Sequence, residues 1–372
     1  MQEIVREFVE LVKIPVHSRD ERLIADSLKI KLLELGLEVY EDDVGQKIGG
    51  NAGNIIAVLR GQTALPAVIF SAHMDRVANN GCIQPQIDER QGIITSDGQS
   101  ILAADNVAGL SVILAALRHI KGSGQVHGDI EVVLSACEED GVLGSKYLDY
   151  SRLQSKIALV FDISGRVGRI VNRAPSKCKL SYTIHGKSAH AGNEPEKGIN
   201  AIKAAAALIN SLPDGRISPC TTANIATIHA GGTTTNTVCD RVEILAEVRS
   251  NETVEFDELL DTFRSASKLI EREFGVTVDY AEDIFYRSFY VKEDELLIEL
   301  LKKSMLSEGV SAAITSGGGG MDGNRFNAQG IKSVGVAPGY EKNHTPNERV
   351  HIADLEKCTA IAVKFVELLA KS

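Results

Sequence analysis

The sequence predicts an α/β protein into which a second, smaller α+β domain is inserted. Short β-branched apolar runs alternate with helical segments in the first third of the chain. After about Val171 the strands become half-exposed and alternating, and after Phe289 the chain returns to the earlier pattern. We therefore expect a discontinuous first domain at residues 1–172 and 286–372, and an inserted domain at residues 173–285.

The first domain is expected to begin with two helices, Met1–Lys13 and Asp20–Leu35. Asp20 is the expected N-cap of the second helix, and Gly36 is its expected C-terminal stop. Apolar segments of the kind that are buried on both faces then follow. They are the strands Asn54–Leu59, Ala67–Ser71, Ile130–Leu134 and Ala158–Phe161, and the helix Val107–Ile120. Strands separated by helices favour a mostly parallel sheet.

The inserted domain has the order strand–helix–strand–strand–helix–strand, which is typical of a ferredoxin-like layer. Its elements are expected at Lys179–His185, Asn200–Leu212, Ile225–Ala230, Val242–Val248, Phe256–Phe274 and Val276–Tyr280. The first domain is then completed by the helix Glu293–Ser307, the strand Ser333–Ala337 and the helix Ile352–Leu369.

Bulk composition excludes several classes of function. A formal net charge of -10 disfavours binding to nucleic acid or to anionic membranes, because no excess of cations is present to neutralise phosphates. No apolar stretch has the length of a membrane span, and residues 1–14 lack the apolar core of a signal peptide. The six cysteines form no C-x-x-C pair. We expect a cytoplasmic protein that binds neither nucleic acid nor membrane.

Five metal-ligating side chains follow apolar segments of the first domain. They are His73, Asp105, Glu139, Asp162 and His344. Ligands bind at the carboxyl ends of strands in open α/β sheets, so we expect these side chains to converge. Two imidazoles and three carboxylates without a thiolate suit zinc, cobalt or manganese. One bridging carboxylate and two further ligands for each ion give a two-metal hydrolytic site.

Two further carboxylates complete the predicted chemistry. Glu138 is expected to act as general base beside the ligand Glu139, and Asp75 is expected to orient His73. Each of these residues has a simpler interpretation when it is considered alone. Asp105 would then stabilise a helix start, residues 138–140 would form a solvated acidic loop, and His344 would lie on the surface. Their joint order along the chain favours the metal site.

Six motifs resemble those of the aminoacylase/peptidase T family of dinuclear zinc peptidases, and most closely those of its peptidase T-like members. They are SAHMDRV (71–77), SDGQSILAADNVAG (96–109), ACEEDGVLGSK (136–146), LVFD (159–162), GKSAHAG (186–192) and YEKNHTPNE (340–348). The resemblance covers nearly the whole chain. It implies a zinc-peptidase fold with a three-layer αβα catalytic domain and an inserted ferredoxin-like lid and dimerisation domain.

The resemblance also implies a role for each site residue. Asp105 would bridge two metal ions, with His73 and Asp162 completing one site and Glu139 and His344 completing the other. Three residues of the inserted domain would contact a substrate. They are His190, which would reach the substrate carbonyl oxygen, often across a dimer interface, and Arg249 and Asn236 (in TTTNTV, 233–238), which would bind its terminal carboxylate.

The chain departs from the family pattern at several positions. Asn106 and Val107 replace the usual polar pair, and Arg76 and Met321 replace two threonines expected near the substrate. Gly317–Gly320 is open to two interpretations, a substrate loop or a flexible turn. Asp322 is likewise either functional or a turn residue.

The resemblance implies two-metal hydrolysis of an amide bond in a short peptide, by an aminopeptidase or tripeptidase that forms a homodimer through its inserted domain. A deacylase or carboxypeptidase of the same family, acting on N-acyl amino acids, is the alternative. A catalytically silent binding protein on the same fold is a third possibility, which the retained Glu138 disfavours.

Overall fold

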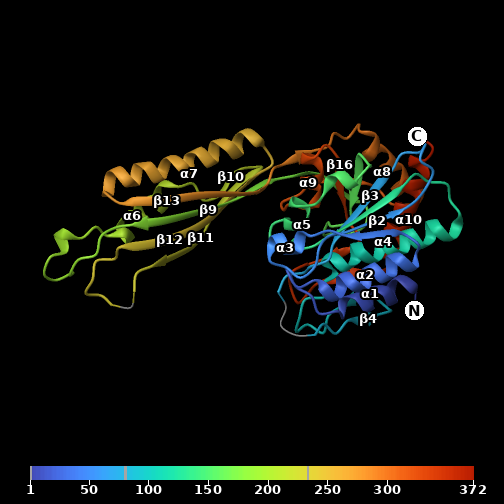
Figure 1. Cartoon of the computed structure of the whole chain (residues 1–372), viewed down its shortest axis with the longest axis horizontal. Coiled ribbons are helices and arrows are strands. Elements are labelled where there is room, and N and C mark those ends of the chain that lie inside the picture. The colour runs from blue at the N-terminus through green and yellow to red at the C-terminus, as the bar shows by residue number, and fades with distance from the viewer. Residues whose placement is uncertain (1, 79–81, 233) are drawn as a thin grey trace. The chain divides into compact units, whose positions relative to one another are not determined.

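The computed structural model describes residues 2–78, 82–232 and 234–372 (Figure 1). Met1 of the first predicted helix and Thr233 of the TTTNTV motif lie outside the described residues. The chain divides into two compact units. The first unit comprises Met1–Ala174 and Phe289–Ser372, and the second comprises Pro175–Ser288. The expected boundaries after residues 172 and 285 lie two and three residues before these.

A sheet of nine strands, counted over the described residues, runs through the first unit in the order β1-β2-β6-β3-β7-β16-β8-β14, with β15 paired to β8. Its strands are β1 (Glu38–Glu41), β2 (Ile55–Leu59), β3 (Val68–His73), β6 (Ile130–Ser135), β7 (Ile157–Val160), β8 (Arg169–Ala174), β14 (Phe289–Tyr290), β15 (Ala313–Ser316) and β16 (Lys332–Val336).

The sheet is mixed, with parallel pairs in its centre and between β15 and β8. Strands β6, β3, β7 and β16 are parallel neighbours, whereas β2 is antiparallel to β6 and β8 is antiparallel to β16. The expectation of a mostly parallel sheet is therefore wrong for β1, β2, β8 and β14, which form antiparallel pairs. Strand direction depends on long-range pairing, which the apolar pattern of a single strand does not record.

Helices cover both faces of this sheet (Figure 1). Every residue of β3 and β6 is buried, as expected for strands that are covered on both sides. Helix α4 packs on β3 and against α1 and α10, while α9 packs on β7 and β16, which gives the expected three layers. The helices are α1 (Glu3–Val12), α2 (Arg22–Glu34), α3 (Val44–Ile48), α4 (Ala104–Ser123), α5 (Leu143–Lys146), α8 (Leu296–Ser307), α9 (Asp322–Ala328) and α10 (Ile352–Leu369), with a 3-10 turn η1 (Tyr150–Arg152).

The start of α2 differs from the expectation. Glu21, not Asp20, is the N-cap residue, and its side chain makes no capping bond. The Glu21 carboxylate instead accepts hydrogen bonds from the backbone N–H groups of Arg19 and Cys137. The predicted stop is confirmed, because Gly36 adopts a left-handed conformation with φ of 77°.

A second, four-stranded sheet of the first unit has the order β17-β18-β5-β4, counted over the described residues. Its strands are β4 (Gln86–Asp88), β5 (Ile93–Thr95), β17 (Tyr340–Glu341) and β18 (Arg349–His351). The loop between β17 and β18 carries His344, and this sheet therefore positions that residue. Within the described residues, we find no helix that is long and apolar enough to cross a bilayer.

The second unit is a five-stranded antiparallel sheet with the order β10-β11-β12-β9-β13 over the described residues. Helices α6 and α7 pack against this sheet and against each other (Figure 1). The elements are β9 (Ser176–His185), η2 (Pro195–Lys197), α6 (Ala201–Ser211), β10 (Gly215–Ser218), β11 (Thr221–Ala230), β12 (Arg241–Ser250), α7 (Thr253–Phe274) and β13 (Thr277–Tyr286). Without the short β10, this is the expected ferredoxin-like order.

Candidate metal centre

Three of the predicted ligands lie at one edge of the parallel centre of the sheet. His73 is the last residue of β3, Glu139 lies four residues beyond β6, and Asp162 lies two residues beyond β7. Strands β6, β3 and β7 are adjacent and parallel, so their carboxyl ends meet. Asp105 differs from this pattern, because it lies at the start of α4 with non-helical backbone angles.

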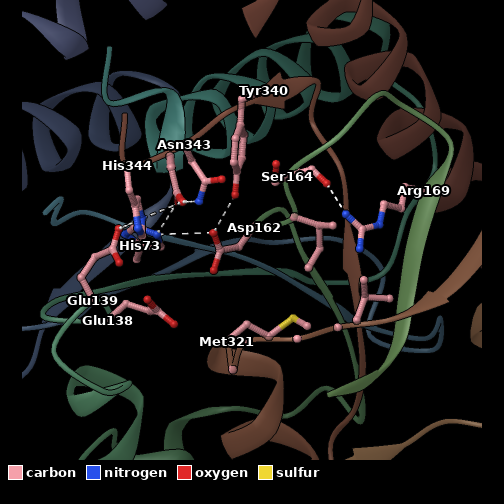
Figure 2. A pocket seen from close by; sticks show the side chains of 17 residues that line it. His73, Glu138, Glu139, Asp162, Ser164, Arg169, Met321, Tyr340, Asn343 and His344 are labelled. Carbon is pink, nitrogen blue, oxygen red and sulfur yellow. Dashed lines mark hydrogen bonds and ion pairs between the residues drawn. The ribbon is translucent and has the colours of Figure 1, made fainter. Parts of the chain in front are cut away.

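Asp105 joins the two imidazoles. Its Oδ1 lies 3.0 Å from Nε2 of His73, and its Oδ2 lies 3.3 Å from Nε2 of His344. Nε2 of His73 is also 3.4 Å from Oδ1 of Asp162, and Nε2 of His344 is 3.0 Å from Oε1 of Glu139. The five predicted ligands therefore form one continuous cluster around Asp105 (Figure 2).

Glu138 lies beside this cluster with its carboxylate turned into the same cavity (Figure 2). No described residue donates a hydrogen bond to that carboxylate, whereas Glu139 next to it contacts His344. Glu138 is buried, and one of its carboxylate oxygens lies within 4.8 Å of ligand atoms of His73 and Asp162. It is therefore placed to exchange a proton with a molecule in the cavity.

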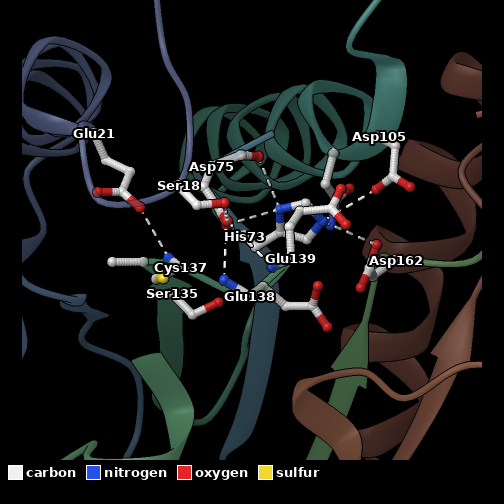
Figure 3. A network of polar contacts seen from close by, with 12 residues as sticks. Ser18, Glu21, His73, Asp75, Asp105, Ser135, Cys137, Glu138, Glu139 and Asp162 are labelled. Carbon is white, nitrogen blue, oxygen red and sulfur yellow. Dashed lines mark hydrogen bonds and ion pairs between the residues drawn. The ribbon is translucent and has the colours of Figure 1, made fainter. Parts of the chain in front are cut away.

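The buried carboxylate of Asp75 fixes the loop that carries Glu138 and Glu139 (Figure 3). Asp75 accepts hydrogen bonds from the backbone N–H groups of both glutamates, at 2.9 and 3.1 Å, and from Oγ of Ser18 at 2.7 Å. Asp75 also contacts Nδ1 of His73, through its backbone oxygen at 3.0 Å and its Oδ1 at 3.3 Å. The expected role of Asp75 in orienting His73 is compatible with this geometry.

A second buried carboxylate holds the backbone at Asp105. Glu348 is fully buried and accepts hydrogen bonds from the N–H groups of Leu102, Ala103 and Asp105, at 2.7 to 3.0 Å. Ala103 adopts the left-handed region with φ of 60°, which is unfavourable for an alanine. Backbone strain of this kind persists only where the surroundings hold it in place, and Glu348 supplies that support.

The pKa shifts in the cluster indicate that its negative charge favours the binding of cations. Burial raises the pKa of Glu138 well above its ordinary value, and the neighbouring Asp162 adds to the shift. Burial likewise raises the pKa of Asp162 to about 7. The carboxylates of Asp105 and Glu139 raise the pKa of His344 to about 10. Crowded carboxylates thus bind protons strongly when no other positive charge is present.

The donor set fits two divalent ions. Two triads of donors, namely His73 with Asp105 and Glu139, and His73 with Glu138 and Asp162, each lie within 4.8 Å of one another. Imidazole and carboxylate donors without a thiolate suit zinc, cobalt or manganese. The fit rests on the donor types and on the unneutralised negative charge of the cluster.

The cavity has a volume of about 260 Å³ and reaches beyond the cluster. Gly317–Gly320 and Met321 line it, which agrees with a position near the substrate for Met321. Arg76 does not line it, so the expectation for that residue is wrong. The Arg76 side chain is buried and donates to the carbonyls of Leu11 and Val12 at the end of α1.

Asp322 is not an exposed turn residue. It is the first residue of α9, it is buried, and its Oδ2 accepts a hydrogen bond from Oγ of Ser135. Ser135 ends β6, so this bond holds the strand three residues before Glu138 in the chain.

The remaining predicted residues lie in the second unit, at two separate positions. His190 and Asn236 are on neighbouring loops, joined by a hydrogen bond from the N–H of Ala191 to the carbonyl of Asn236 at 2.9 Å. Arg249 is near the far end of β12, where its Nε contacts Glu247 at 2.8 Å. Along β12, Arg249 is eight residues from Arg241 at the loop end, which is roughly 26 Å at the usual rise.

Four polar residues of the cavity were missed by the sequence interpretation. Nδ2 of Asn343 donates to Oδ2 of Asp105 at 2.7 Å, and the hydroxyl of Tyr340 donates to Oδ1 of Asp162 at 3.3 Å. Ser164 and Arg169 line the far side of the cavity (Figure 2). Asn343 and Tyr340 lie in the motif of His344, which is a usable signal, but nothing in the sequence singles out Arg169.

Two family profiles match the chain. Residues 172–273 match a peptidase dimerisation domain, and residues 54–191 match peptidase family M28. Among curated proteins, the chain is 36% identical to an uncharacterised protein, YqjE, of Bacillus subtilis, covering 99% of this chain and 98% of the relative. It is 22% identical to peptidase T of Clostridium botulinum, covering all of both chains.

Solved structures give the same picture. Aminopeptidase PepT from Bacillus cereus is 37% identical with a TM-score of 0.90, and 99% of this chain and 98% of that chain are covered. A tripeptidase from Staphylococcus aureus is 33% identical with a TM-score of 0.94, and 100% of this chain and 99% of that chain are covered. A dinuclear metal-binding peptidase of the M20 family from Bacillus subtilis is 17% identical with a TM-score of 0.75, and 99% of this chain and 98% of that chain are covered, which is a likeness of fold.

Proposed function

The chain belongs to the M20 family of metallopeptidases, as a peptidase T-like member, and we propose that it removes the N-terminal residue of short peptides at a dinuclear zinc centre. One observation carries the proposal: a single buried carboxylate, Asp105, presents one oxygen to each of two imidazoles. A carboxylate that faces two ligand sets in this way suits the bridge between two ions.

Each ion is assigned two further ligands. His73 and Asp162 would hold one ion, and Glu139 and His344 would hold the other, in agreement with the contacts around Asp105. Asn343 would orient the oxygen of Asp105 that faces His344, because its amide donates to that oxygen. When bound, two such ions polarise a carbonyl and lower the pKa of a water molecule. Zinc is the ion we propose, with cobalt and manganese as the alternatives to test.

Glu138 is proposed as the general base. Its carboxylate would take the proton of the attacking water and return it to the leaving amine. The hydrogen bonds from its backbone and from that of Glu139 to Asp75 hold it facing the cavity. Burial and the neighbouring carboxylates raise the pKa of Glu138 when no cation is bound. Two bound divalent ions would lower this pKa, so that the carboxylate could accept the proton.

The cavity supports a short substrate. A volume of about 260 Å³ admits a small ligand and excludes folded chains. We propose that the second unit contributes His190 to the carbonyl oxygen of the scissile bond, and Arg249 and Asn236 to the terminal carboxylate. His190 is exposed, and Arg249 lies at the opposite end of β12 from the loop of Asn236. Two copies of the chain would therefore be needed to use both places.

We accordingly propose a homodimer formed through the second unit. The match to a peptidase dimerisation domain supports it. The edge of β11 supports it as well, because its pairing with β10 ends at Ala223, and Asn224–Ala230 pairs only with β12 among the described residues. Ile228 on that edge is 48% exposed, and sheet edges of this kind readily pair with another chain. The expected cytoplasmic location stays a prediction, which cell fractionation tests.

The decisive experiment separates metal binding from chemistry. Glu138→Gln should retain two zinc ions per chain, measured by mass spectrometry of the metal content, and lose nearly all turnover of tripeptides. Substantial remaining turnover would reject Glu138 as the base. A panel of dipeptides, tripeptides, N-blocked tripeptides and N-acyl amino acids tests the substrate class. Cleavage of only the N-acyl substrates would replace the aminopeptidase by a deacylase.

A further inference from the structure

One cation of the catalytic cavity takes no part in the chemistry described above. Arg169, the first residue of β8, lines the cavity on the side opposite His73, Glu139 and His344 (Figure 2). Among the described residues that line the cavity, it is the only arginine or lysine. The other acidic and imidazole side chains that line the cavity are the four carboxyl groups and two histidines described above.

The guanidinium of Arg169 is held in place by neutral partners. Its Nε donates to Oγ1 of Thr315 at 3.0 Å, and its Nη1 donates to the carbonyl oxygen of Ser164 at 2.7 Å. Thr315 lies on β15, which pairs in parallel with β8, so two elements fix the plane of the group. These bonds use two of the five N–H donors that a guanidinium has.

The charge of Arg169 is not neutralised by the protein. It forms no ion pair with any carboxylate in the part of the chain that the structure describes. Arg166, three residues earlier, is different, because its Nε and Nη2 contact the two oxygens of Asp354 at 2.6 and 3.0 Å. A fixed, half-buried guanidinium with free donors is suited to bind a carboxylate with two parallel hydrogen bonds.

The cavity wall strengthens this preference. Ile163, Val171 and Met321 line the cavity and are largely buried, so the dielectric near Arg169 is lower than in water. Without Arg169, the described residues that line the cavity would offer a substrate carboxylate no cation other than the imidazoles of the proposed metal ligands. A ligand whose carbonyl lies at the cluster and whose carboxylate reaches Arg169 satisfies both ends of the cavity.

We propose that Arg169 is a specificity-determining residue that binds a carboxylate of the substrate and gives the enzyme a preference for anionic peptides. This rests on the proposed peptidase function. The carboxylate has two sources, an acidic side chain or the peptide's own C-terminus. Because Arg249 is already proposed for the C-terminus, the acidic side chain is the source we expect.

The test compares peptides of equal size that differ in one charge. For the side chain, the pairs are Glu-Ala-Ala with Gln-Ala-Ala and Ala-Glu-Ala with Ala-Gln-Ala. For the C-terminus, the pair is Ala-Ala-Ala with its C-terminal amide. The zinc-loaded wild type should show a kcat/KM about tenfold or more higher for the anionic member of one side-chain pair. Arg169→Gln should bring that ratio to about 1, mainly through KM for the anionic peptide.

Three further variants separate charge recognition from a structural role. Arg169→Lys keeps the charge without the fork and should retain part of the preference. Thr315→Val removes the contact to Nε that helps to fix the plane of the guanidinium, and it should lower the preference without abolishing it. Arg166→Gln, the matched control, should leave the preference in place, because its partner is Asp354. Unfolding temperatures of all variants show which of them are folded.

The outcomes are distinguishable. Arg169→Gln could instead lose only the preference for Ala-Ala-Ala over its C-terminal amide, with the side-chain pairs unaffected. That result would assign Arg169 to the C-terminal carboxylate and still support the proposal. Equal hydrolysis of every matched pair by the wild type, or an unchanged preference in folded Arg169→Gln, would overturn it while leaving the peptidase intact. A zinc-loaded wild type that cleaves no peptide would overturn both proposals.

Discussion

The carboxylate of Asp75 accepts a hydrogen bond from the backbone N–H of Glu138, with Oδ1 and N 2.9 Å apart. Its other oxygen accepts from the N–H of Glu139, so one side chain just beyond β3 fixes two successive residues beyond β6. The same carboxylate contacts the imidazole of His73. The position of the proposed base and the orientation of a proposed ligand are thus set by one buried residue.

Asp75→Asn should lower kcat about 10- to 100-fold, because an asparagine has one acceptor oxygen where two N–H groups must be satisfied. Steady-state kinetics of the zinc-loaded variant measure the effect. Ser18→Ala is the matched control, since it removes only the hydroxyl donor to Asp75 and keeps both backbone bonds. If Ser18→Ala impairs turnover as much as Asp75→Asn, the backbone bonds are not what matters.

Glu348→Gln should lower the free energy of unfolding by about 1 to 3 kcal/mol, because it leaves a buried N–H group of residues 102–105 without an acceptor. The displaced backbone at Asp105 should also reduce the zinc content below two ions per chain. Urea unfolding and metal analysis measure the two effects. Glu341→Gln serves as control, because Glu341 contacts Arg349 and His351 and lies outside that network. A variant with full stability and full zinc content would contradict the proposed support of Asp105.

Removal of the metals should abolish turnover and destabilise the protein. Ions that bind only the folded chain stabilise it by about 2.7 kcal/mol when their free concentration is a hundred times Kd. Thermal unfolding before and after chelation, followed by zinc readdition, checks this. His344→Ala should reduce the zinc-dependent gain, whereas His351→Ala, whose imidazole contacts Glu341 instead of the cluster, should retain it. An equal gain in both variants would count against His344 as a ligand.

Glu41 should make stability depend on pH in the acid range. Burial alone would raise the pKa of Glu41, but hydrogen bonds from Arg22, from the N–H of Gly53 and from Lys29 lower it to about 2. An unfolded glutamate has a pKa of about 4.3. The depressed pKa therefore stabilises the fold above about pH 4.3, and this contribution is lost as the pH falls toward about 2.

Glu41→Gln should lower the unfolding free energy of the metal-free protein at pH 7 by about 1 to 2 kcal/mol, after allowance for partial solvent screening. The difference from wild type should shrink between about pH 5 and pH 2. Glu38→Gln, on the same strand, removes the exposed pair with Arg60 and should change stability little. A difference that persists undiminished at pH 2 would refute the assignment to Glu41.

The sequence was sufficient for much of the fold and of the candidate cluster. Apolar runs that end in a histidine or a carboxylate identify β3, β6 and β7 together with His73, Glu139 and Asp162, because strand and ligand are adjacent in the chain. The elements of the second unit could also be predicted from the sequence, because the spacing of apolar residues within each segment is typical of a strand or of a helix. The order of polar motifs then indicated which residues would meet.

Features that depend on distant partners were not readable. The direction of β2 and β8 depends on pairing across the sheet. The Arg76 side chain does not line the cavity, because it donates to a carbonyl group at the end of α1. Arg169 looked like any charged residue at the start of a strand. Only its neighbours Thr315 and Ser164, brought together by β15 and the loop after β7, show that it faces the cavity.

What the sequence by itself determined is the ligand chemistry, because side-chain type and local periodicity are properties of short segments. Only the tertiary structure decided which of those groups contact each other. Asp105 faces His73 with one oxygen and His344 with the other, although 32 residues separate it from one and 239 from the other. Contacts of that kind arise from the packing of whole elements, and no local pattern specifies them.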